Sequence, residues 1–282
     1  MARTYDPAQL DTIKATMRPT TGRMIREDGA TTNMADIALH NPASIARGDV
    51  PGVATVDAMG RRDADKAETN QPITPVDSGI HALDAGGQMS VQSTSADDTA
   101  GGTGARAIRI HYLDTAGVER SEDVALNGTT AVPTTATDIM FVQCQHLTDA
   151  GSGGAAAGDI STTNGGAEHS RIKAGDTRCT SSWRMVPAGK RLVITDWALS
   201  SISATSDSRS VVKMASNWIL GELFENPRIL FAHQSLGAQN GGEAAPLETP
   251  LVFPAGALVG ATHTSSKACT TTAAWRGYHE DA

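Results

Sequence analysis

The stretch AIRIHYLD at residues 107–114 decides the fold class, because apolar and polar residues alternate along it. Alternation of this kind places the apolar side chains on one face of a β-strand. Residues 118–126 and 138–143 continue the pattern, and the three strands together predict an antiparallel meander. Asn127-Gly128 predicts a tight type I′ hairpin turn, which needs a positive φ at Gly128.

The second half of the chain repeats this style, with short apolar runs separated by turns that contain Gly or Pro. Further strands are expected at residues 182–186, 191–199, 210–214, 218–224, 228–233, 251–253, 257–262 and 271–278. Short strands at a spacing of roughly 8–12 residues indicate a sandwich or jelly roll. We therefore predict an all-β fold, a jelly roll or β-sandwich over residues 105–282. It forms either one domain or two sandwiches, at 105–175 and 176–282.

The first 104 residues have a different composition. Residues 31–104 contain no aromatic residue and are dominated by Ala, Asp, Gly, Thr and Ser. A free chain of this composition would be disordered. We therefore predict that residues 1–104 form an extended N-terminal arm that is held by neighbouring subunits.

One short helix is predicted within this arm, at residues 6–17. Pro7 suits the first helical position, and Leu10, Ile13 and Met17 recur at helical spacing. A helix of this length is not stable alone, so its apolar stripe docks either on its own β domain or on a partner protein. Asp28-Gly29 predicts a turn between short extended pieces. The expected interface residues are Leu10, Ile13, Met17, Met24, Ile25 and Ile37.

Composition excludes several classes of function. The 282 residues carry a formal net charge of −8, whereas nucleic-acid binding needs clustered Lys and Arg to neutralise phosphates. No apolar run approaches the ~20 residues that span a bilayer, and the N-terminus lacks the apolar segment of a signal peptide. We expect no nucleic-acid partner, no membrane partner, and synthesis in a cytoplasm.

The sequence indicates no metal or cofactor. The three cysteines, Cys144, Cys179 and Cys269, have the wide spacing of buried small side chains rather than of a disulfide or zinc framework. A metal site at Cys144 and His146 would need further ligands, such as His111 and His169, which no pattern fixes. Asp149, Asp159 and Asp176 flank Gly-rich loops without a recognised calcium motif.

No catalytic signature is present, and the chain is predicted not to be an enzyme. The sequence Gly151-Ser152-Gly153-Gly154 lacks the G-x-S-x-G spacing of a nucleophile elbow. Four tryptophans lie inside expected strands, which favours core or subunit-interface packing over a sugar-binding platform. They are Trp183, Trp197, Trp218 and Trp275.

Strand runs that end in a Pro-Ala-Gly turn occur twice, as VPAGK at residues 186–190 and PLVFPAG at 250–256. Other motifs are IHYLD at 110–114, VALNGTT at 124–130, TDI at 137–139 and ITDW at 194–197. Together they resemble the virion jelly rolls of tailed bacteriophages, including head-decoration and tail-associated proteins. The resemblance covers just over half of the chain, at residues 105–160 and 185–278, and it brings no catalytic residues.

This resemblance implies a structural component of a bacteriophage particle, located in the virion. The favoured role is a homo-oligomeric capsid decoration or cement protein, a trimer that contacts other virion proteins such as the major capsid protein. The N-terminal arm would lie across neighbouring subunits. A tail, neck or fibre protein, or a module that binds a host glycan, remains an alternative.

Overall fold

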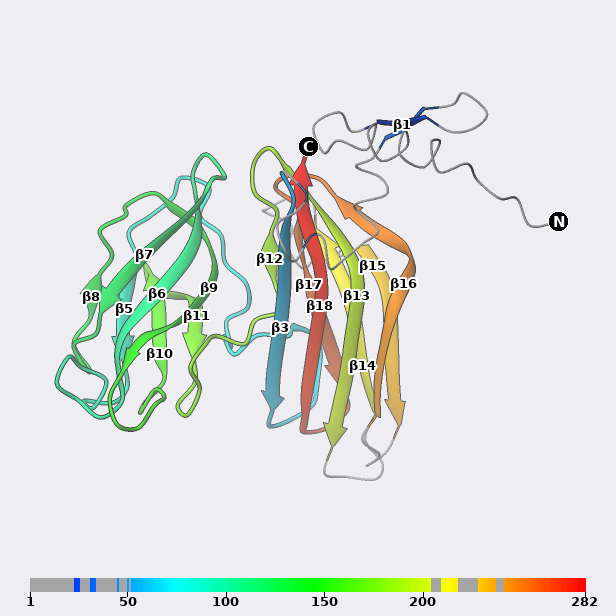
Figure 1. Cartoon of the computed structure of the whole chain (residues 1–282). Helices are drawn as coiled ribbons and strands as arrows, with labels where there is room; N and C mark the ends of the chain where they lie inside the picture. Colours follow the sequence, from blue (N-terminus) through cyan, green and yellow to red (C-terminus); the bar gives the residue numbers. More distant parts are fainter. Residues whose placement is uncertain are drawn as a thin grey trace, which may run out of the picture.

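The computed structural model describes residues 23–25, 31–33, 45, 50, 52–203, 209–217, 228–236 and 241–282. These residues form strands β1 to β18, and every strand pairing is antiparallel. The predicted all-β fold is confirmed. The structure contains two β-sandwiches that stand side by side (Figure 1). No helix in this described part is long and apolar enough to span a membrane.

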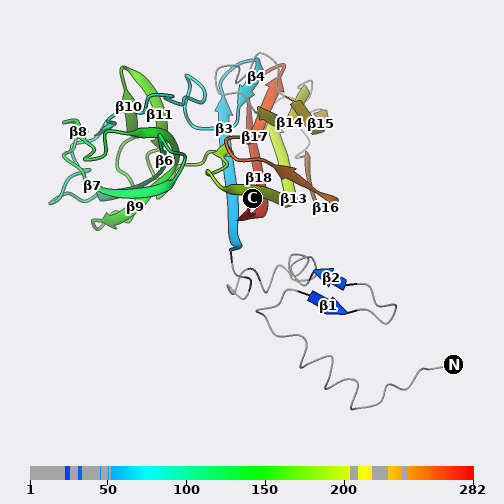
Figure 2. The same cartoon turned by 90° about the horizontal axis from the view of Figure 1, so that it is seen from above.

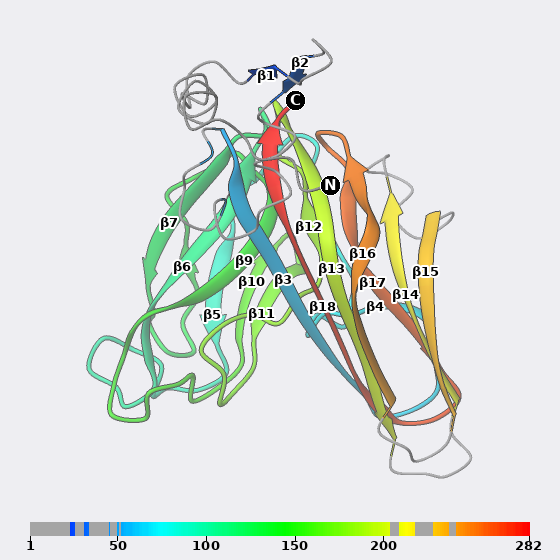
Figure 3. The same ribbon diagram turned by 45° about the vertical axis from the view of Figure 1, so that its right-hand side comes forward.

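The first sandwich combines two stretches that lie far apart in the chain. Its strands are β3 (Ala54–Ala64), β4 (Glu68–Pro72), β12 (Arg184–Met185), β13 (Lys190–Ser203), β14 (Arg209–Asn217), β15 (Arg228–Leu236), β16 (Gly241–Phe253), β17 (Leu258–Ser265) and β18 (Cys269–Asp281). One sheet has the order β16-β13-β18-β3 and the other β15-β14-β17, with β4 and β12 both pairing with β17. Figure 3 shows β3, β18 and β13 side by side along one face.

This strand order is that of a jelly roll. Without the two-residue β12, the eight strands in chain order are β3, β4 and β13 to β18. Numbered from one to eight, they give sheets 1-8-3-6 and 2-7-4-5, so that successive strands alternate between the sheets up to the hairpin of β14 and β15. Two sheets wound in this way form the double Greek key of a jelly roll.

Apolar side chains from both sheets fill the interior of the jelly roll. The buried cluster consists of Ala58, Ile73, Val186, Leu192, Ile194, Leu199, Val212, Phe253, Ala257, Val259, Ala261, Ala273 and Trp275. Burial of each large aliphatic or aromatic side chain contributes roughly 1.5–3 kcal/mol. A packed interior of this kind holds the two sheets together.

The second sandwich is inserted between β4, the second strand of the jelly roll, and the short β12 that precedes its third strand, β13. Its strands are β5 (Ser90–Ser93), β6 (Ala105–Asp114), β7 (Glu119–Ala125), β8 (Val132–Pro133), β9 (Ile139–Ala150), β10 (Ile160–Asn164) and β11 (Ala167–Ile172). The sheets have the orders β11-β10-β5-β8 and β7-β6-β9. Seen from above, this insert lies beside β3, the edge strand of the jelly roll (Figure 2).

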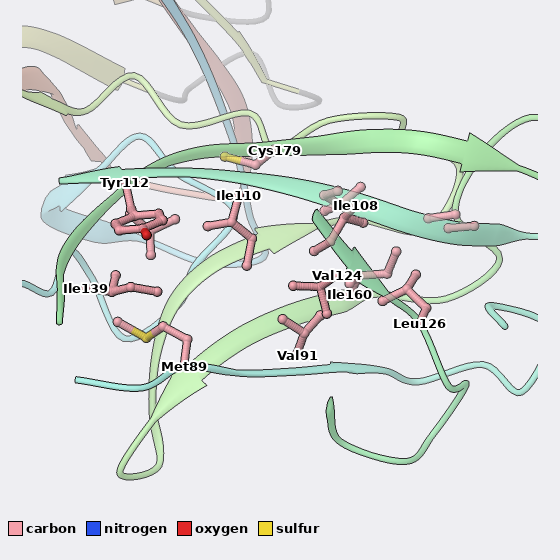
Figure 4. Close-up of a cluster of buried hydrophobic side chains, with 14 residues drawn as sticks. Met89, Val91, Ile108, Ile110, Tyr112, Val124, Leu126, Ile139, Ile160 and Cys179 are labelled. Carbon is pink, nitrogen blue, oxygen red and sulfur yellow. The ribbon is translucent and has the colours of Figure 1, made fainter. Parts of the chain in front are cut away.

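The insert has its own apolar core between its two sheets. Figure 4 shows Ile108, Ile110 and Tyr112 of β6 directed toward Met89, Val91 and Ile160. The alternation that was read from residues 107–114 is therefore real, with Ile108, Ile110 and Tyr112 buried on one face. The order of strands differs from the predicted meander, because β6 lies between β7 and β9.

The expectation of an arm over residues 1–104 is wrong for much of that range, because β3, β4 and β5 lie within it. Large side chains are scarce in β3, yet the strand forms because it packs against backbone atoms rather than against bulky side chains. A Cβ at Gly60 would lie 2.6 Å from both the carbonyl oxygen of Ile73 and the amide nitrogen of Ser182. Small residues are what this close approach requires.

Two other expectations fall partly outside the described residues. The helix predicted at residues 6–17 and the strand at 218–224 lie outside them. The extended pieces around Asp28-Gly29 are seen as β1 (Arg23–Ile25) and β2 (Thr31–Asn33), a short antiparallel ladder in which Met24 pairs with Thr32. Further along the chain, Ile45 and Val50 are buried against Val193 and Tyr278 of the jelly roll.

Candidate functional site

A cavity of about 640 Å³ lies between the jelly roll and the insert. We call it the inter-sandwich cavity. Its walls come from β3 and the end of β18 on one side, from β6, β7 and β9 on the other, and from residues 178–184 of the connection. Its lining consists of Thr55, Val56, Asp57, Met59, His111, Tyr112, Glu119, Arg120, Ser121, Gln143, Cys144, Gln145, His146, Arg178, Cys179, Arg184 and His279.

The alternation of β3 explains how one strand serves both the core and the cavity. Ala58 and Gly60 face the interior of the jelly roll, whereas Asp57 and Met59 are exposed on the opposite side. β3 is the edge strand nearest the insert (Figure 1). Its outward side chains therefore form one wall of the cavity. Small inward residues bring the strand close to its neighbours, and outward polar residues give the cavity its chemistry.

Two stacked histidines form part of the opposite wall. The rings of His111 in β6 and His146 in β9 have centroids 5.2 Å apart and an interplanar angle of 20°. Burial lowers the pKa of His111, and the nearby charges of His146, Arg109 and Arg184 lower it further. A lowered pKa favours neutral imidazole at His111 near pH 7, so the stacked pair is not a pair of repelling cations.

A third histidine lines the cavity from the jelly roll. His279 in β18 is only 6% exposed, and its Nε2 atom has no hydrogen-bond partner. Burial, aided by the charge of Lys190, lowers the pKa of His279 to about 4. A buried polar nitrogen without a partner costs free energy, so His279 is an unsatisfied polar group next to the cavity.

The connection between the sandwiches supplies two guanidinium groups. Arg184 donates from Nη1 to the carbonyl oxygens of Ser181 and Trp183, at 3.1 and 2.8 Å, which fixes its position. Arg178 makes no ion pair with another described residue. Arg120, on the insert side, is already paired with Asp114 at 3.1 Å. The cavity also contains two carboxylates, Asp57 and Glu119.

The cavity does not have the features of a thiol-dependent active site. Burial raises the pKa of Cys144, which keeps the sulfur protonated and weakly nucleophilic. The three cysteines are free, with Cys179 and Cys269 buried and Cys144 half-buried, so the predicted role as packed side chains is confirmed for two of them. No group of three or more potential metal ligands occurs among the described residues.

A second polar cluster lies inside the jelly roll. His263 donates or accepts at both ring nitrogens: Nε2 lies 2.6 Å from Oε2 of Glu68, and Nδ1 lies 3.0 Å from Oγ1 of Thr271. Arg62 forms a bidentate pair with Glu68, at 2.6 and 2.8 Å. The sulfur of Cys269 lies 4.0 Å from Nδ1 of the same imidazole.

This cluster shifts two pKa values. Burial raises the pKa of Cys269, but hydrogen bonds with His263, Thr271 and Ser265 outweigh it and bring the pKa to about 7. Burial also raises the pKa of Glu68, and its bonds with Arg62 and His263 reverse this to a net lowering. The thiol, imidazole and carboxylate resemble a hydrolytic triad in composition. However, His263 is 0% exposed and Cys269 is 6% exposed, so the cluster is a buried structural network without access for a substrate.

The residues weighed for a metal site are not all brought together. His111, Cys144 and His146 share the wall of the inter-sandwich cavity. His169 lies in β11 of the other sheet, and its ring is tilted by 57° against that of His81, at a centroid distance of 5.7 Å. Asp159 is used structurally, because its Oδ1 accepts a hydrogen bond from the backbone N–H of Ala174 at 2.9 Å.

The tryptophans lie in the core, as predicted, where they are described. Trp183 and Trp275 are each 1% exposed, and Trp197 packs against the jelly-roll cluster. Trp218 lies outside the described residues, as do the expected interface residues Leu10, Ile13, Met17 and Ile37. Met24 and Ile25 belong to β1, so their predicted interface role stays a prediction.

Sequence reasoning missed the inter-sandwich cavity as a site. Asp57 lies in the range that the sequence predicts as an extended arm, and Arg178, Arg184 and His279 belong to no local motif. They meet only because residues 54–72 join residues 184–281 in one sandwich. The sequence signal in this region is the alternation over residues 107–114 and 138–143, which predicts two strands. In the structure these strands, β6 and β9, pair so that His111 lies opposite Cys144.

No family model matches the chain, and no curated protein matches it. Among solved structures, the VP2 subviral particle of infectious bursal disease virus matches with 8% identity and a TM-score of 0.20, covering 81% of this chain and 72% of that chain. The Gx strain of the same virus gives 8% identity, a TM-score of 0.20, and coverage of 82% and 73%. Its T=1 particles give 10% identity, a TM-score of 0.18, and coverage of 81% and 69%. TM-scores this low do not indicate a shared fold and carry no functional conclusion.

Proposed function

We propose that this chain is a structural subunit of a virus particle. The observation that carries the proposal is the strand order of the jelly roll, β16-β13-β18-β3 over β15-β14-β17-β4. Capsid proteins, lectins and cupins all use double-sheet jelly rolls. Cupin-type chemistry inside the roll is disfavoured because one part of the interior is packed with apolar side chains and the polar cluster around His263 is buried.

The way in which the insert is attached fits a subunit with two lobes. It enters after β4 and returns through β12, so both connections lie on the same side of the jelly roll (Figure 1). The jelly roll keeps all eight of its strands despite the interruption. The jelly roll would then serve as the assembly body, and the insert would project from it.

Within this class, we favour a decoration or cement protein of a tailed-bacteriophage capsid that assembles as a trimer. The residues ahead of β3 would contact neighbouring subunits or the major capsid protein. The sequence resemblance supports this role, as does the weak core-forming capacity of the first 53 residues, which contain one aromatic residue, Tyr5. A tail, neck or fibre position fits the same fold.

Negative-stain electron microscopy of the full-length protein tests the proposal. Symmetric oligomers with the jelly rolls at the centre and the inserts outside are expected. Particles that remain single two-lobed molecules at all concentrations would contradict it.

A second candidate function is recognition of a glycan at the particle surface. The observation that favours it is the inter-sandwich cavity, which has a suitable size for a small ligand and is lined by charged and polar side chains. A surface lobe that carries a ligand cavity is compatible with a structural role for the same subunit.

A further inference from the structure

The inter-sandwich cavity presents hydrogen-bond donors that are not all used within the protein. Arg178 has no ion-pair partner among the described residues, and Arg184 bonds through Nη1 to two carbonyl oxygens while its Nη2 makes no described bond. His279 adds a ring nitrogen that is buried and unpartnered. Guanidinium groups bind carboxylates through paired N–H donors, which gives both affinity and geometric selectivity.

The same cavity contains hydrogen-bond acceptors. Asp57 on β3 and Glu119 on β7 place carboxylates in its lining. A simple inorganic anion would be attracted by the arginines but repelled by these two groups. A ligand that carries one acidic group together with several hydroxyls would satisfy both, because hydroxyls donate well to carboxylates.

The shape of the cavity is consistent with a ligand of that type. Its volume of about 640 Å³ falls in the range of roughly 300–1,000 Å³ that is usual for small-ligand sites. The stacked rings of His111 and His146 form part of one wall. Because the walls belong to both sandwiches, a bound ligand would bridge the jelly roll and the insert.

We infer that the inter-sandwich cavity binds an acidic saccharide that carries a carboxylate group. Arg178 and Arg184 bind the carboxylate, and Asp57 and Glu119 accept hydrogen bonds from sugar hydroxyls. His279 lines the same cavity from β18. The inference rests on the second candidate function and is independent of whether the chain assembles into particles.

The test is isothermal titration calorimetry of the full-length protein with four probes. Two are acidic saccharides, 3′-sialyllactose and a disaccharide of glucuronic acid and N-acetylglucosamine. The others are lactose and inorganic phosphate. At least one acidic saccharide is expected to bind at least tenfold more tightly than lactose and phosphate. Absence of binding by both acidic saccharides, or equal binding of lactose or phosphate, would overturn the inference.

Variants locate the site. Arg178→Gln is expected to weaken binding of the acidic saccharide at least tenfold, because it removes a guanidinium group that binds the carboxylate. The variant should fold normally, since this side chain makes no hydrogen bond or ion pair with another described residue. Asp57→Asn should also weaken it. Arg61→Gln is the matched control, because Arg61 lies on the same strand as Asp57, pairs with Asp63 and does not line the cavity. Equal weakening by Arg61→Gln and Arg178→Gln would show general charge attraction and overturn the assignment.

The outcome separates this inference from the proposed structural role. Electron microscopy of Arg178→Gln should show the same oligomers as the unchanged protein, because the cavity is internal to one subunit. Loss of saccharide binding with unchanged oligomers supports the cavity as a ligand site. Loss of the oligomers in Arg178→Gln would contradict the placement of the cavity within a single subunit.

Discussion

The side chain of Gln143 in β9 pairs with both backbone polar groups of Met185 in β12. Its Nε2 donates to the carbonyl oxygen of Met185 at 2.6 Å, and the N–H of Met185 donates to its Oε1 at 3.0 Å. One amide side chain therefore takes the place of a strand neighbour and links the insert to the jelly roll. An apolar cluster surrounds this link, formed by Ile80, Leu113, Phe141, Trp183, Met185 and Leu258.

Replacement of Gln143 by Leu should destabilise the protein. The change leaves a buried N–H and a buried C=O of Met185 without partners, at a cost of about 1–3 kcal/mol for each group. The expected loss in the free energy of unfolding is therefore about 2–6 kcal/mol, measured by urea denaturation. Gln92→Leu is the control, because Gln92 is exposed and makes one bond, to the carbonyl oxygen of Thr129. A loss below ~1 kcal/mol in Gln143→Leu would show that the link is dispensable.

Asp98 organises the loops of the insert and should be intolerant of substitution. It is 0% exposed, and its Oδ1 accepts from the backbone N–H groups of Ala105 and Ala157, at 2.6 and 2.9 Å. Its Oδ2 accepts from Ser93 Oγ and the N–H of Gly158, at 2.6 and 2.9 Å. Hydrogen bonds to a charged group contribute roughly 1.5–3 kcal/mol each.

Asp98→Ala should therefore lower the free energy of unfolding by at least ~3 kcal/mol. Asp98→Asn should be intermediate, because it keeps one acceptor oxygen but points an N–H₂ group at two donors. Thermal unfolding followed by circular dichroism measures both variants. Asp97→Ala serves as the neighbouring exposed control. Similar melting temperatures for Asp98→Ala and Asp97→Ala would contradict the role of Asp98.

Gly260 in β17 leaves room for the indole of Trp183. A Cβ at this position would lie 2.3 Å from Cδ2 of Trp183, and the indole Nε1 donates to the carbonyl oxygen of Ala261 at 2.9 Å. Gly260→Ala should displace the ring and cost about 1–3 kcal/mol through overpacking, with a change in the near-ultraviolet dichroism of tryptophan. Gly101→Ala is the control, since nothing lies within 4 Å of its Cβ. An unchanged tryptophan signal in Gly260→Ala would refute this packing.

Two buried histidines predict a loss of stability in mild acid. Burial lowers the pKa of His169 and His279 to about 4, from an ordinary value of 6.5, with smaller contributions from the charges of His81 and Lys190. Between these values the unfolded chain binds more protons than the folded one. The free energy of unfolding must therefore fall as the pH falls from about 6.5 to about 4, and these two groups contribute no loss above that window.

Proton NMR of the imidazole resonances measures this effect directly. Two resonances should titrate near pH 4 in the folded protein, and they should be absent from the variants His169→Gln and His279→Gln, one from each. Titration of both histidines near 6.5 would mean that they are not buried as the structure shows.

Much of the strand pattern could be predicted from sequence, and the pairing of strands could not. Alternation over residues 107–114 identified β6 because its buried face is made of large apolar residues, Ile108, Ile110 and Tyr112. Strand β3 was missed because its inward residues, Ala58 and Gly60, are small and give no hydrophobic signal. Its stability comes from pairing with β18, more than 200 residues away in the chain.

Turn chemistry was predicted in part. Gly128 has the expected positive φ, 59°, but the turn is centred one residue later than the predicted Asn127-Gly128 turn. The bridge joins Asn127 to Thr130, so that Gly128 is the first central residue, as in a type II′ turn. The turn leads toward β8 in the opposite sheet rather than closing a hairpin between β7 and β9. The local sequence predicts that the turn needs a glycine with a positive φ. The strands that the turn connects depend on the whole fold and could not be predicted from it.

Deletion experiments distinguish the N-terminal segment from the jelly roll. Removal of residues 1–100 deletes β3, β4 and β5 and should abolish cooperative unfolding, since it strips an edge strand from both jelly-roll sheets. Removal of residues 1–44 retains Ile45 and Val50, which are buried against Val193 and Tyr278. This shorter deletion should keep the melting temperature nearly unchanged. A folded, cooperative 1–100 deletion would contradict the assignment of β3 and β4 to the jelly roll.

The central claim, that the chain is an assembling structural subunit, is tested most directly by light scattering coupled to size-exclusion chromatography. The account predicts a trimer for the full-length protein and a folded monomer after deletion of residues 1–44. A full-length protein with the mass of one chain, 29.3 kDa, at every concentration would contradict it.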